Sequence, residues 1–503
     1  MKKEPPAHPH PKARRTAFTR LTYLVLLLIV LLLLVMAGIT FSIKQERYSA
    51  DSSQIFPLHE GYAERLSKAV SFRTVSNYDT SFCDSLPFDE LHRFLRMQFP
   101  RVFETCQVQK YHRHALCLQL NGSQSDFSNE PLVFLAHQDE VDAGDSGWVH
   151  PPFSGFSDGE SIWGRGTLDD KGSLLAMLEA LETLLQNGWQ PERTLILALG
   201  DDEETYGKGA HAMAAALQHT KTSPIAVFDE GLVITHGLVP MVKKPVALIG
   251  IAEKGYLSLK ITAQQAGGHS STPAKQSSIL LLNEAITRLY RLGQSSTLTT
   301  PVKAFLAALA PEIPWPTRIV FANLWITSPL IKRIYKQSAG GNALVSNTIA
   351  FTQLKAGYTD NVIPPAAEAT VNIRLLPGTS IEDMINRIHD ALNMPGIQIE
   401  ILQPAHNASE VANSGSWVYQ KIHECILAEF PGTVIVPGLV TATSDSRAYT
   451  GLTTDIFRFA PYQLDANALE SIHGFNERIS IKNYTLMIRY YQRLFMSLAG
   501  ARE

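Results

Sequence analysis

The fold is decided by three apolar stretches, PLVFLAH (131–137), TLILALG (194–200) and PIAVFDEG (224–231). Each is short and rich in Leu, Ile and Val, which is typical of strands buried on both faces of a mostly parallel sheet. Each ends in His, Asp or Glu or is followed directly by them. Because open α/β sheets bind ligands at the carboxyl ends of their strands, these polar residues are predicted to share one site.

Working outward, helices alternate with such strands over 56–253, and this pattern resumes over 406–503. Between them, 254–405 reads as strand, helix, strand, strand, helix, strand, which is a ferredoxin-like order. An apolar, helical insertion at 299–345 either covers an apolar group or extends the hydrophobic core. We therefore predict an α/β fold. Its discontinuous catalytic domain has a mixed, mostly parallel sheet with helices on both faces, and a ferredoxin-like α+β lid domain is inserted into it.

The N-terminal part carries a candidate membrane anchor. Residues 21–43 are uncharged and apolar, close to the ~20 residues that a spanning helix needs. Residues 1–20 are basic, whereas the tether at 44–55 is nearly neutral. The positive-inside rule then leaves the N-terminus cytoplasmic and the catalytic part periplasmic, extracellular or lumenal. The alternative is a cleaved signal peptide, but its apolar region would have only ~7–15 residues.

Charge and cysteine content exclude other classes of protein. The 503 residues have a net charge of −3 and no basic surface for nucleic acid beyond the N-terminal tail. The cysteines have no CxxC spacing, which argues against a thiolate zinc site and a disulfide-dense scaffold. Cys106 and Cys117 either form a disulfide across a hairpin in an oxidising compartment or remain free thiols.

The strand-end motifs contain residues that can bind metal ions. AHQDEVD (136–142) places His137 and Asp139 two apart, so on an extended chain both point the same way and the carboxylate can hold the imidazole. WGRGTLDDKG (163–172) presents Asp169 just before a helix. GDDEETYGKGA (200–210) has four consecutive acids, which repel one another unless cations neutralise them.

Two further segments complete the set. VFDEG (227–231) offers Asp229, and SIHGFNERIS (471–480) offers His473. Each motif alone has a structural explanation, such as a favourable helix dipole or a buried histidine. Together they supply enough nitrogen and oxygen ligands for two zinc-class ions that share one carboxylate. Such a pair lowers the pKa of a bridging water and polarises a carbonyl, as amide hydrolysis requires.

The longer motifs resemble those of the co-catalytic zinc peptidases and aminoacylases. The resemblance covers nearly all of the chain from about residue 55 and is carried by GRGTLDDK, DEG, AGYTDNVIPP, TSDSRAY and IHGFNERIS. Within that family the chain looks most similar to carboxypeptidase S and the N-fatty-acyl-amino acid synthase/hydrolase branch.

The resemblance implies two Zn²⁺ per subunit, with Co²⁺ or Mn²⁺ as possible substitutes. The implied ligands are His137, Asp169, Glu204, Asp229 and His473. Asp169 would bridge the ions, Glu203 would be the general base and Asp139 would orient His137. The Asp169–Asp170 peptide bond would be cis.

The inserted domain is implied to contribute to the same site. His269 resembles a histidine that stabilises the tetrahedral oxyanion, and in many family members it comes from a partner subunit. A homodimer through the lid domain is therefore expected. Asn361 and Arg374 match substrate-contacting positions, and Arg447 suits a carboxylate clamp because guanidinium pairs bidentately. A structural salt bridge is the alternative role for Arg447.

The leading hypothesis is a di-zinc hydrolase of amide bonds in N-acyl amino acids or at peptide C-termini, with the reverse synthesis left open. Its substrate would be a small molecule or short peptide with a free carboxylate. The alternatives are a strict carboxypeptidase on small peptides and a non-catalytic, membrane-tethered binding protein. The last would lack the base or a ligand, whereas all of them are present here.

Overall fold

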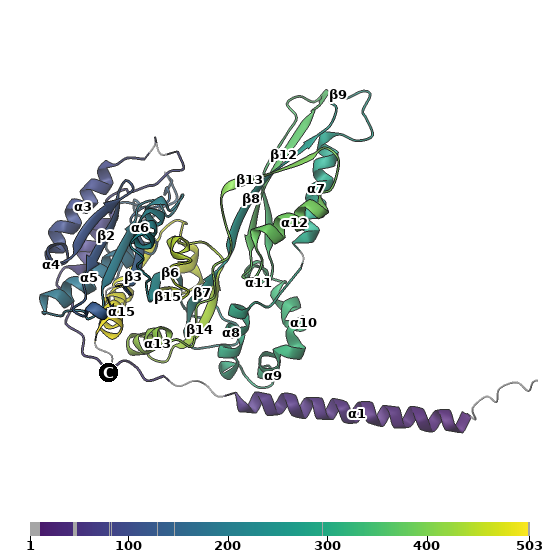
Figure 1. The fold of residues 1–503 in the computed structure, drawn as a ribbon, viewed down its shortest axis with the longest axis horizontal. Coiled ribbons are helices and arrows are strands. Elements are labelled where there is room, and N and C mark those ends of the chain that lie inside the picture. Colours follow the sequence, from purple (N-terminus) through teal and green to yellow (C-terminus); the bar gives the residue numbers. More distant parts are fainter. Residues whose placement is uncertain are drawn as a thin grey trace, which may run out of the picture.

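The computed structural model describes residues 11–500 except 44–47, 80, 82, 128, 145 and 294. The first ten residues of the predicted basic tail and four residues of the predicted tether therefore lie outside the described residues. The chain forms a compact α/β part, an extended arm and a long N-terminal helix (Figure 1).

The α/β part is built on a mixed sheet of eight strands in the order β1-β2-β5-β3-β6-β15-β7-β14. β3 is parallel to both β5 and β6, and β6 is parallel to β15, whereas β1 and β2 are antiparallel neighbours. The strands are β1 (Gln107–Tyr111), β2 (Ala115–Leu120), β3 (Leu132–His137), β5 (Leu195–Gly200), β6 (Ala226–Thr235), β7 (Val246–Glu253), β14 (Val434–Val440) and β15 (Ile456–Leu464). The mixed α/β sheet predicted from the sequence is confirmed.

Helices cover both faces of this sheet. On β3, Leu132 and Phe134 pack into a core with α5 (Lys171–Gln186) and α15 (Ile481–Ala499), while Val133 and Leu135 pack toward α6 (Lys208–His219). Side chains alternate along a strand, so a strand with no polar residue in its interior must be covered on both sides. The remaining helices of this part are α2 (Tyr62–Val70), α3 (Leu86–Gln98), α4 (Pro100–Thr105), α13 (Trp417–Glu429) and α14 (Ala466–Glu470).

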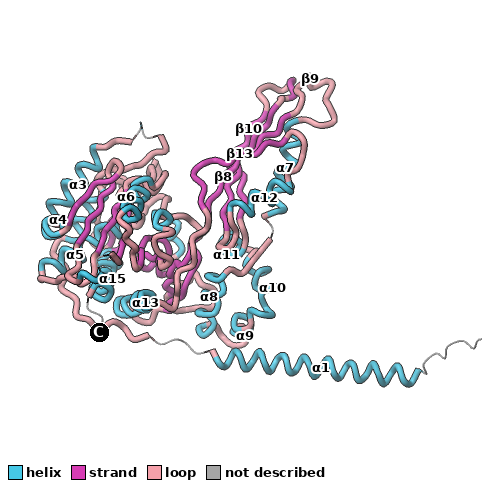
Figure 2. The backbone as a smooth tube through the Cα atoms, in the orientation of Figure 1, coloured by secondary structure: helices cyan, strands magenta, loops and turns pink. Residues whose placement is uncertain are grey.

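Residues 255–292 and 348–406 form the arm, which projects from the end of the large sheet (Figure 2). Four antiparallel strands in the order β10-β12-β8-β13 form its sheet, and α7 and α12 pack their apolar faces on it. The elements are β8 (Gly255–Gln264), α7 (Ser278–Leu292), β10 (Thr348–Ala356), β12 (Ala366–Leu375), α12 (Ile381–Ala391) and β13 (Ile397–His406). The short pair β9 (Gly268–His269) and β11 (Val362–Ile363) forms the tip.

The apolar insertion between α7 and β10 folds as helices α8 (Thr300–Leu309), α9 (Arg318–Ala322), α10 (Leu324–Tyr335) and α11 (Ala339–Val345). It contacts the N-terminal helix α1 (Pro11–Ser42). The amide nitrogen of Asn323 lies 3.2 Å from the carbonyl oxygen of Met36, and Phe41 stacks on Trp315. Within α1, the segment Thr19–Ser42 is long and apolar enough to cross a membrane, a property that signal sequences share.

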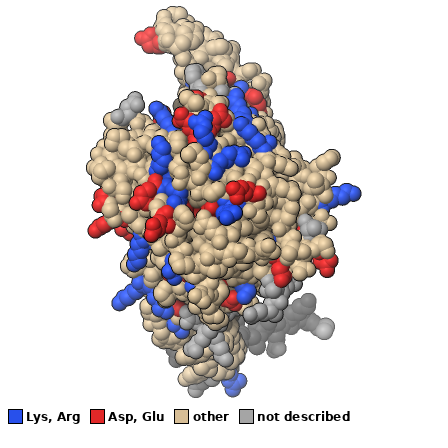
Figure 3. Space-filling model, turned by 90° about the vertical axis from the view of Figure 1, so that its left-hand side faces the viewer, with Lys and Arg blue, Asp and Glu red and all other residues tan. Residues whose placement is uncertain are grey.

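Two predictions about the surface and the thiols can be compared with the structure. On the face drawn in Figure 3, Lys and Arg side chains of the described residues are interspersed with Asp and Glu. All four cysteines are free thiols. Of the two alternatives for Cys106 and Cys117, the structure therefore has the unpaired one.

Candidate metal and catalytic site

The candidate ligands come together where the central strands of the large sheet end. His137 is the last residue of β3, the acids 201–204 directly follow β5, and Asp169 directly precedes Asp170 and α5. His473 lies in the loop between α14 and β16 (Arg478–Ser480). The peptide bond between Asp169 and Asp170 is cis, as the family resemblance implied.

Asp169 lies between the two histidines. Its Oδ1 is 2.9 Å from Nε2 of His137, and its Oδ2 is 3.0 Å from Nε2 of His473. Oε1 of Glu204 is also 3.0 Å from Nε2 of His473. One carboxylate thus offers one oxygen to each histidine, which is the arrangement of a ligand shared by two ions.

The structure departs from the sequence analysis at VFDEG. Oε1 of Glu230 lies 3.5 Å from Nε2 of His137, and Glu230 can join His137 and Glu203 around an ion. Asp229 is buried, and its Oδ2 accepts a hydrogen bond from the backbone nitrogen of Ser446 at 2.7 Å. Consecutive residues of a strand point to opposite faces, so only one of the two acids can face His137. In the structure Glu230 is the acid that lies beside His137, and the role of Asp229 as a metal ligand stays a prediction.

Asp139 contacts both His137 and the loop that carries Glu203 and Glu204. Nδ1 of His137 lies 2.9 Å from the carbonyl oxygen of Asp139 and 3.4 Å from its Oδ1. The same carboxylate accepts hydrogen bonds from the backbone nitrogens of Glu203 and Glu204, both at 3.1 Å, and from the Ser76 hydroxyl at 2.6 Å. Asp139 is fully buried, so the His137 ring and the acid loop are held by one fixed group. Ser76 was not anticipated from the sequence.

Glu203 has the environment of a proton acceptor. Its side chain is 10% exposed, and Nη1 of Arg447 lies 3.6 Å from its Oε1. Burial is the main cause that raises the pKa of Glu203 well above its usual value, with repulsion from buried Asp445 as the next. Burial therefore disfavours the charged form of the Glu203 carboxylate. The sequence analysis did not predict that Asp445 lies near Glu203.

Two buried ion pairs fix the loop that carries Asp169. Nη1 of Arg165 lies 2.6 Å from Oε2 of Glu477, whose Oε1 accepts a hydrogen bond from the backbone nitrogen of Leu168 at 2.8 Å. Nζ of Lys171 lies 2.7 Å from Oε1 of Glu140. Burial raises the pKa of Glu140 to about 7 despite Lys171.

Arg374 and Arg447 share one electrostatic environment. Burial lowers the pKa of Arg374, and the positive charge of Arg447 lowers it further, although the Tyr256 hydroxyl acts in the opposite direction. The Arg374 guanidinium lies over the Tyr256 ring at 4.7 Å from its centroid, and its Nη1 is buried with no hydrogen-bond partner. An unpaired, buried guanidinium nitrogen is available to an anionic ligand.

The structure does not bring His269 and Asn361 to this site within one chain. Both lie at the tip of the arm, where the backbone nitrogen of Ser270 donates to the carbonyl oxygen of Asn361 at 3.1 Å. Figure 1 shows that this tip, at β9, is the end of the arm farthest from β3 and β6. His269 is exposed, and its Nδ1 lies 2.8 Å from the Ser271 hydroxyl.

Comparison with known proteins gives matches over most of the chain. The family model "Peptidase family M20/M25/M40" matches residues 133–497. The chain is 34% identical to "Probable carboxypeptidase S-like 2" of Dictyostelium discoideum, covering 96% of this chain and 95% of the relative. It is 35% identical to "N-fatty-acyl-amino acid synthase/hydrolase PM20D1" of Mus musculus, covering 85% and 86%.

A solved structure shares the fold. The M20 family metallo-carboxypeptidase Sso-CP2 from Sulfolobus solfataricus superposes with a TM-score of 0.63 at 18% identity, covering 87% of this chain and 99% of that one.

Proposed function

The chain belongs to peptidase family M20/M25/M40, and on this premise we propose that it is a two-metal hydrolase of amide bonds next to a free carboxylate. The observation that carries the proposal is Asp169, which offers one oxygen to His137 and the other to His473. We propose Glu230 as a further ligand beside His137 and Glu204 as a further ligand beside His473. Nitrogen and oxygen donors in this number suit Zn²⁺, with Co²⁺ or Mn²⁺ as substitutes.

Bound ions polarise the amide carbonyl and lower the pKa of a water molecule. Glu203 takes the proton from the attacking water and passes it to the leaving amine. Asp139 holds His137 and the backbone of the acid loop, so it acts as a positioning residue.

The substrate side of the proposal rests on the two arginines. Arg374 has a buried nitrogen with no hydrogen-bond partner, Arg447 lies 3.6 Å from Glu203, and guanidinium groups recognise a carboxylate bidentately. N-acyl amino acids and peptide C-termini both carry that carboxylate. We favour N-acyl amino acids because the apolar insertion between α7 and β10 exposes large apolar side chains such as Trp325 and Leu330. A strict carboxypeptidase on small peptides is the second candidate.

Two parts of the proposal concern assembly and location. Because His269 and Asn361 lie at the far tip of the arm, we propose that a homodimer places the tip of one subunit over the metal site of its partner. We also propose that α1 remains as an anchor in the membrane with its N-terminus in the cytosol. The catalytic part then lies outside the cytosol.

Incubation of the full-length protein with a panel of N-acyl amino acids and dipeptides, with and without chelator, tests the reaction. We expect chelator to abolish cleavage, and chelator-insensitive cleavage would refute the metal mechanism. Glu203→Gln should keep both ions and lose turnover. Asp169→Ala should lose ions and activity together. A Glu203→Gln enzyme with full turnover would remove Glu203 from the role of base.

A further inference from the structure

Beyond the site above, the described residues contain two more groups of acids and histidines that could hold an ion. They are His112, Asp201 and Asp202, and Asp89, His92 and His114. In the first group the acids already have donors, since Asp201 accepts from the backbone nitrogen of His114 at 2.7 Å and Asp202 from that of Gly209 at 2.9 Å. Those bonds explain the first group as structural.

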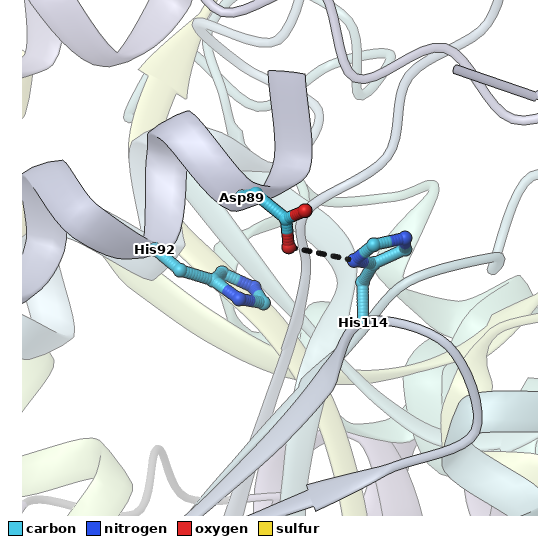
Figure 4. A group of neighbouring side chains, drawn as sticks. All are labelled: Asp89, His92 and His114. Carbon is cyan, nitrogen blue, oxygen red and sulfur yellow. Dashed lines mark ion pairs between the residues drawn. The ribbon is translucent and has the colours of Figure 1, made fainter. Parts of the chain in front are cut away.

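The second group has no such explanation. Asp89 and His92 lie three residues apart on α3 and so share one face of the helix. His114 approaches that face from the turn between β1 and β2, and Figure 4 shows the three side chains converging. Their ligand atoms all lie within 4.8 Å of one another.

His114 has an unsatisfied nitrogen that faces this group. Its Nδ1 is buried without a hydrogen-bond partner, and the residue is only 7% exposed. The nearest acidic atom, Oδ1 of Asp89, is 3.7 Å away, too far for a hydrogen bond. Buried side-chain nitrogens are nearly always paired, so this one calls for a ligand.

The hydrogen bonds of Gln138 fix the protonation of His92. The Gln138 amide nitrogen donates to the carbonyl oxygens of His114 and Leu199, both at 3.0 Å. Its amide oxygen must therefore accept from Nε2 of His92, which lies 2.6 Å away. Burial lowers the pKa of His92, which favours the neutral ring, and with its proton on Nε2 the lone pair on Nδ1 is free. Holding a histidine through its second nitrogen is the common way to orient it as a metal ligand.

His114 is neutral as well. Burial, helped by the charge of Lys110, lowers the pKa of His114 to about 4. Its Nε2 lies 3.1 Å from the Ser85 hydroxyl, which leaves Nδ1 directed at Asp89. Two neutral imidazoles and one carboxylate are the donor types that Zn²⁺ binds.

We propose that Asp89, His92 and His114 form a third divalent-metal site of the zinc class, separate from the site at Asp169. An ion there joins α3 to the turn between β1 and β2. It also joins them, through Gln138, to the strand end that carries His137. The proposal does not depend on the proposed function.

Lys110 gives the proposal a sharp test. Its Nζ lies 3.9 Å from Oδ1 of Asp89, and both side chains are about half exposed. The ammonium group competes with a cation for the same carboxylate, but it is free to move into solvent. Removing its charge should therefore strengthen metal binding, whereas a purely structural cluster would not respond.

The experiment is a Zn²⁺ titration of the full-length, chelator-treated protein in detergent, followed by calorimetry and elemental analysis. We expect three ions per chain, and two in Asp89→Asn and in His92→Gln. Lys110→Gln should bind the third ion roughly threefold to tenfold more tightly. His219→Gln, which changes an exposed histidine of α6, is the matched control and should keep all three ions.

Further variants distinguish this site from the proposed catalytic site. Asp169→Ala should lose catalytic ions and keep the ion that Asp89→Asn removes. Asp89 is exposed, so in excess chelator Asp89→Asn should unfold at the wild-type temperature. A wild-type protein that binds no ion sensitive to Asp89→Asn would overturn the proposal, whatever is found at Asp169. An unchanged affinity in Lys110→Gln would also count against it.

Discussion

The pair Arg165 and Glu477 should be needed for both stability and metal affinity. Both side chains are at most 2% exposed, and their charged atoms lie 2.6 Å apart. Glu477→Gln leaves the Arg165 guanidinium buried beside a neutral amide. Breaking a buried pair in this way costs about 3–5 kcal/mol. Some of that cost is offset, because Nη2 of Arg165 still donates to the carbonyl oxygen of Gly474 at 3.0 Å, so we expect about 3 kcal/mol.

A double-mutant cycle measures the interaction energy of this pair. Its second variant is Arg165→Met. In the double variant no charge is left unpaired, and the glutamine oxygen can still accept from the backbone nitrogen of Leu168, as Oε1 of Glu477 does. We expect an interaction energy of about 1–3 kcal/mol from urea unfolding followed by circular dichroism. Glu477→Gln keeps an oxygen for the backbone nitrogens of Leu168 and Asp169 but loses the charged contact with Arg165 that holds this loop, so Zn²⁺ affinity should fall about 10–100-fold.

The exposed pair Arg73 and Asp142, 3.2 Å apart with side chains 59% and 68% exposed, is the control. Asp142→Asn should change stability by less than about 1 kcal/mol. The reasoning about the buried pair is refuted if the double-variant cycle gives an interaction energy near zero. It is refuted equally if Glu477→Gln binds zinc as tightly as the wild type.

Three further outcomes follow from the site. Elemental analysis should show that Glu230→Gln loses an ion while Asp229→Asn keeps both, and the reverse result would restore Asp229 as the ligand. Coexpressed His269→Ala and Glu203→Gln subunits should regain about a quarter of wild-type activity in a random dimer with sites shared between subunits, and none if each chain works alone. Arg374→Met should raise KM for carboxylate substrates roughly 10–100-fold, measured by steady-state kinetics, with little change for the matching substrate amides.

The central strands were predictable because their sequences allow few other structures. The run 131–137 became β3 (Leu132–His137), and the run 194–200 became β5 (Leu195–Gly200). Uninterrupted Leu, Ile and Val residues of this length suit strands covered on both faces. The polar residues at their ends could then be placed together, because parallel strands bring their carboxyl ends to one edge of the sheet.

What the sequence could not decide was the direction of individual side chains. Asp229 and Glu230 are adjacent acids in β6, and a shift of one residue exchanges which of them faces His137. That choice depends on how β6 pairs with β3 and β15, which local sequence does not encode. The same limit applied to Ser76, since its hydroxyl reaches Asp139 from 63 residues away in the chain.

The four consecutive acids 201–204 show how the fold resolves a local electrostatic conflict. The sequence predicts that they repel one another unless cations neutralise them. In the structure Asp201 and Asp202 turn away from the metal site and accept hydrogen bonds from backbone nitrogens of the β1–β2 turn and of α6. Only Glu203 and Glu204 face the site, and Asp139 holds their backbone. The fold thus uses two of the acids to fix the loop, which leaves the carboxylates of Glu203 and Glu204 for the roles in proton transfer and metal binding that we propose.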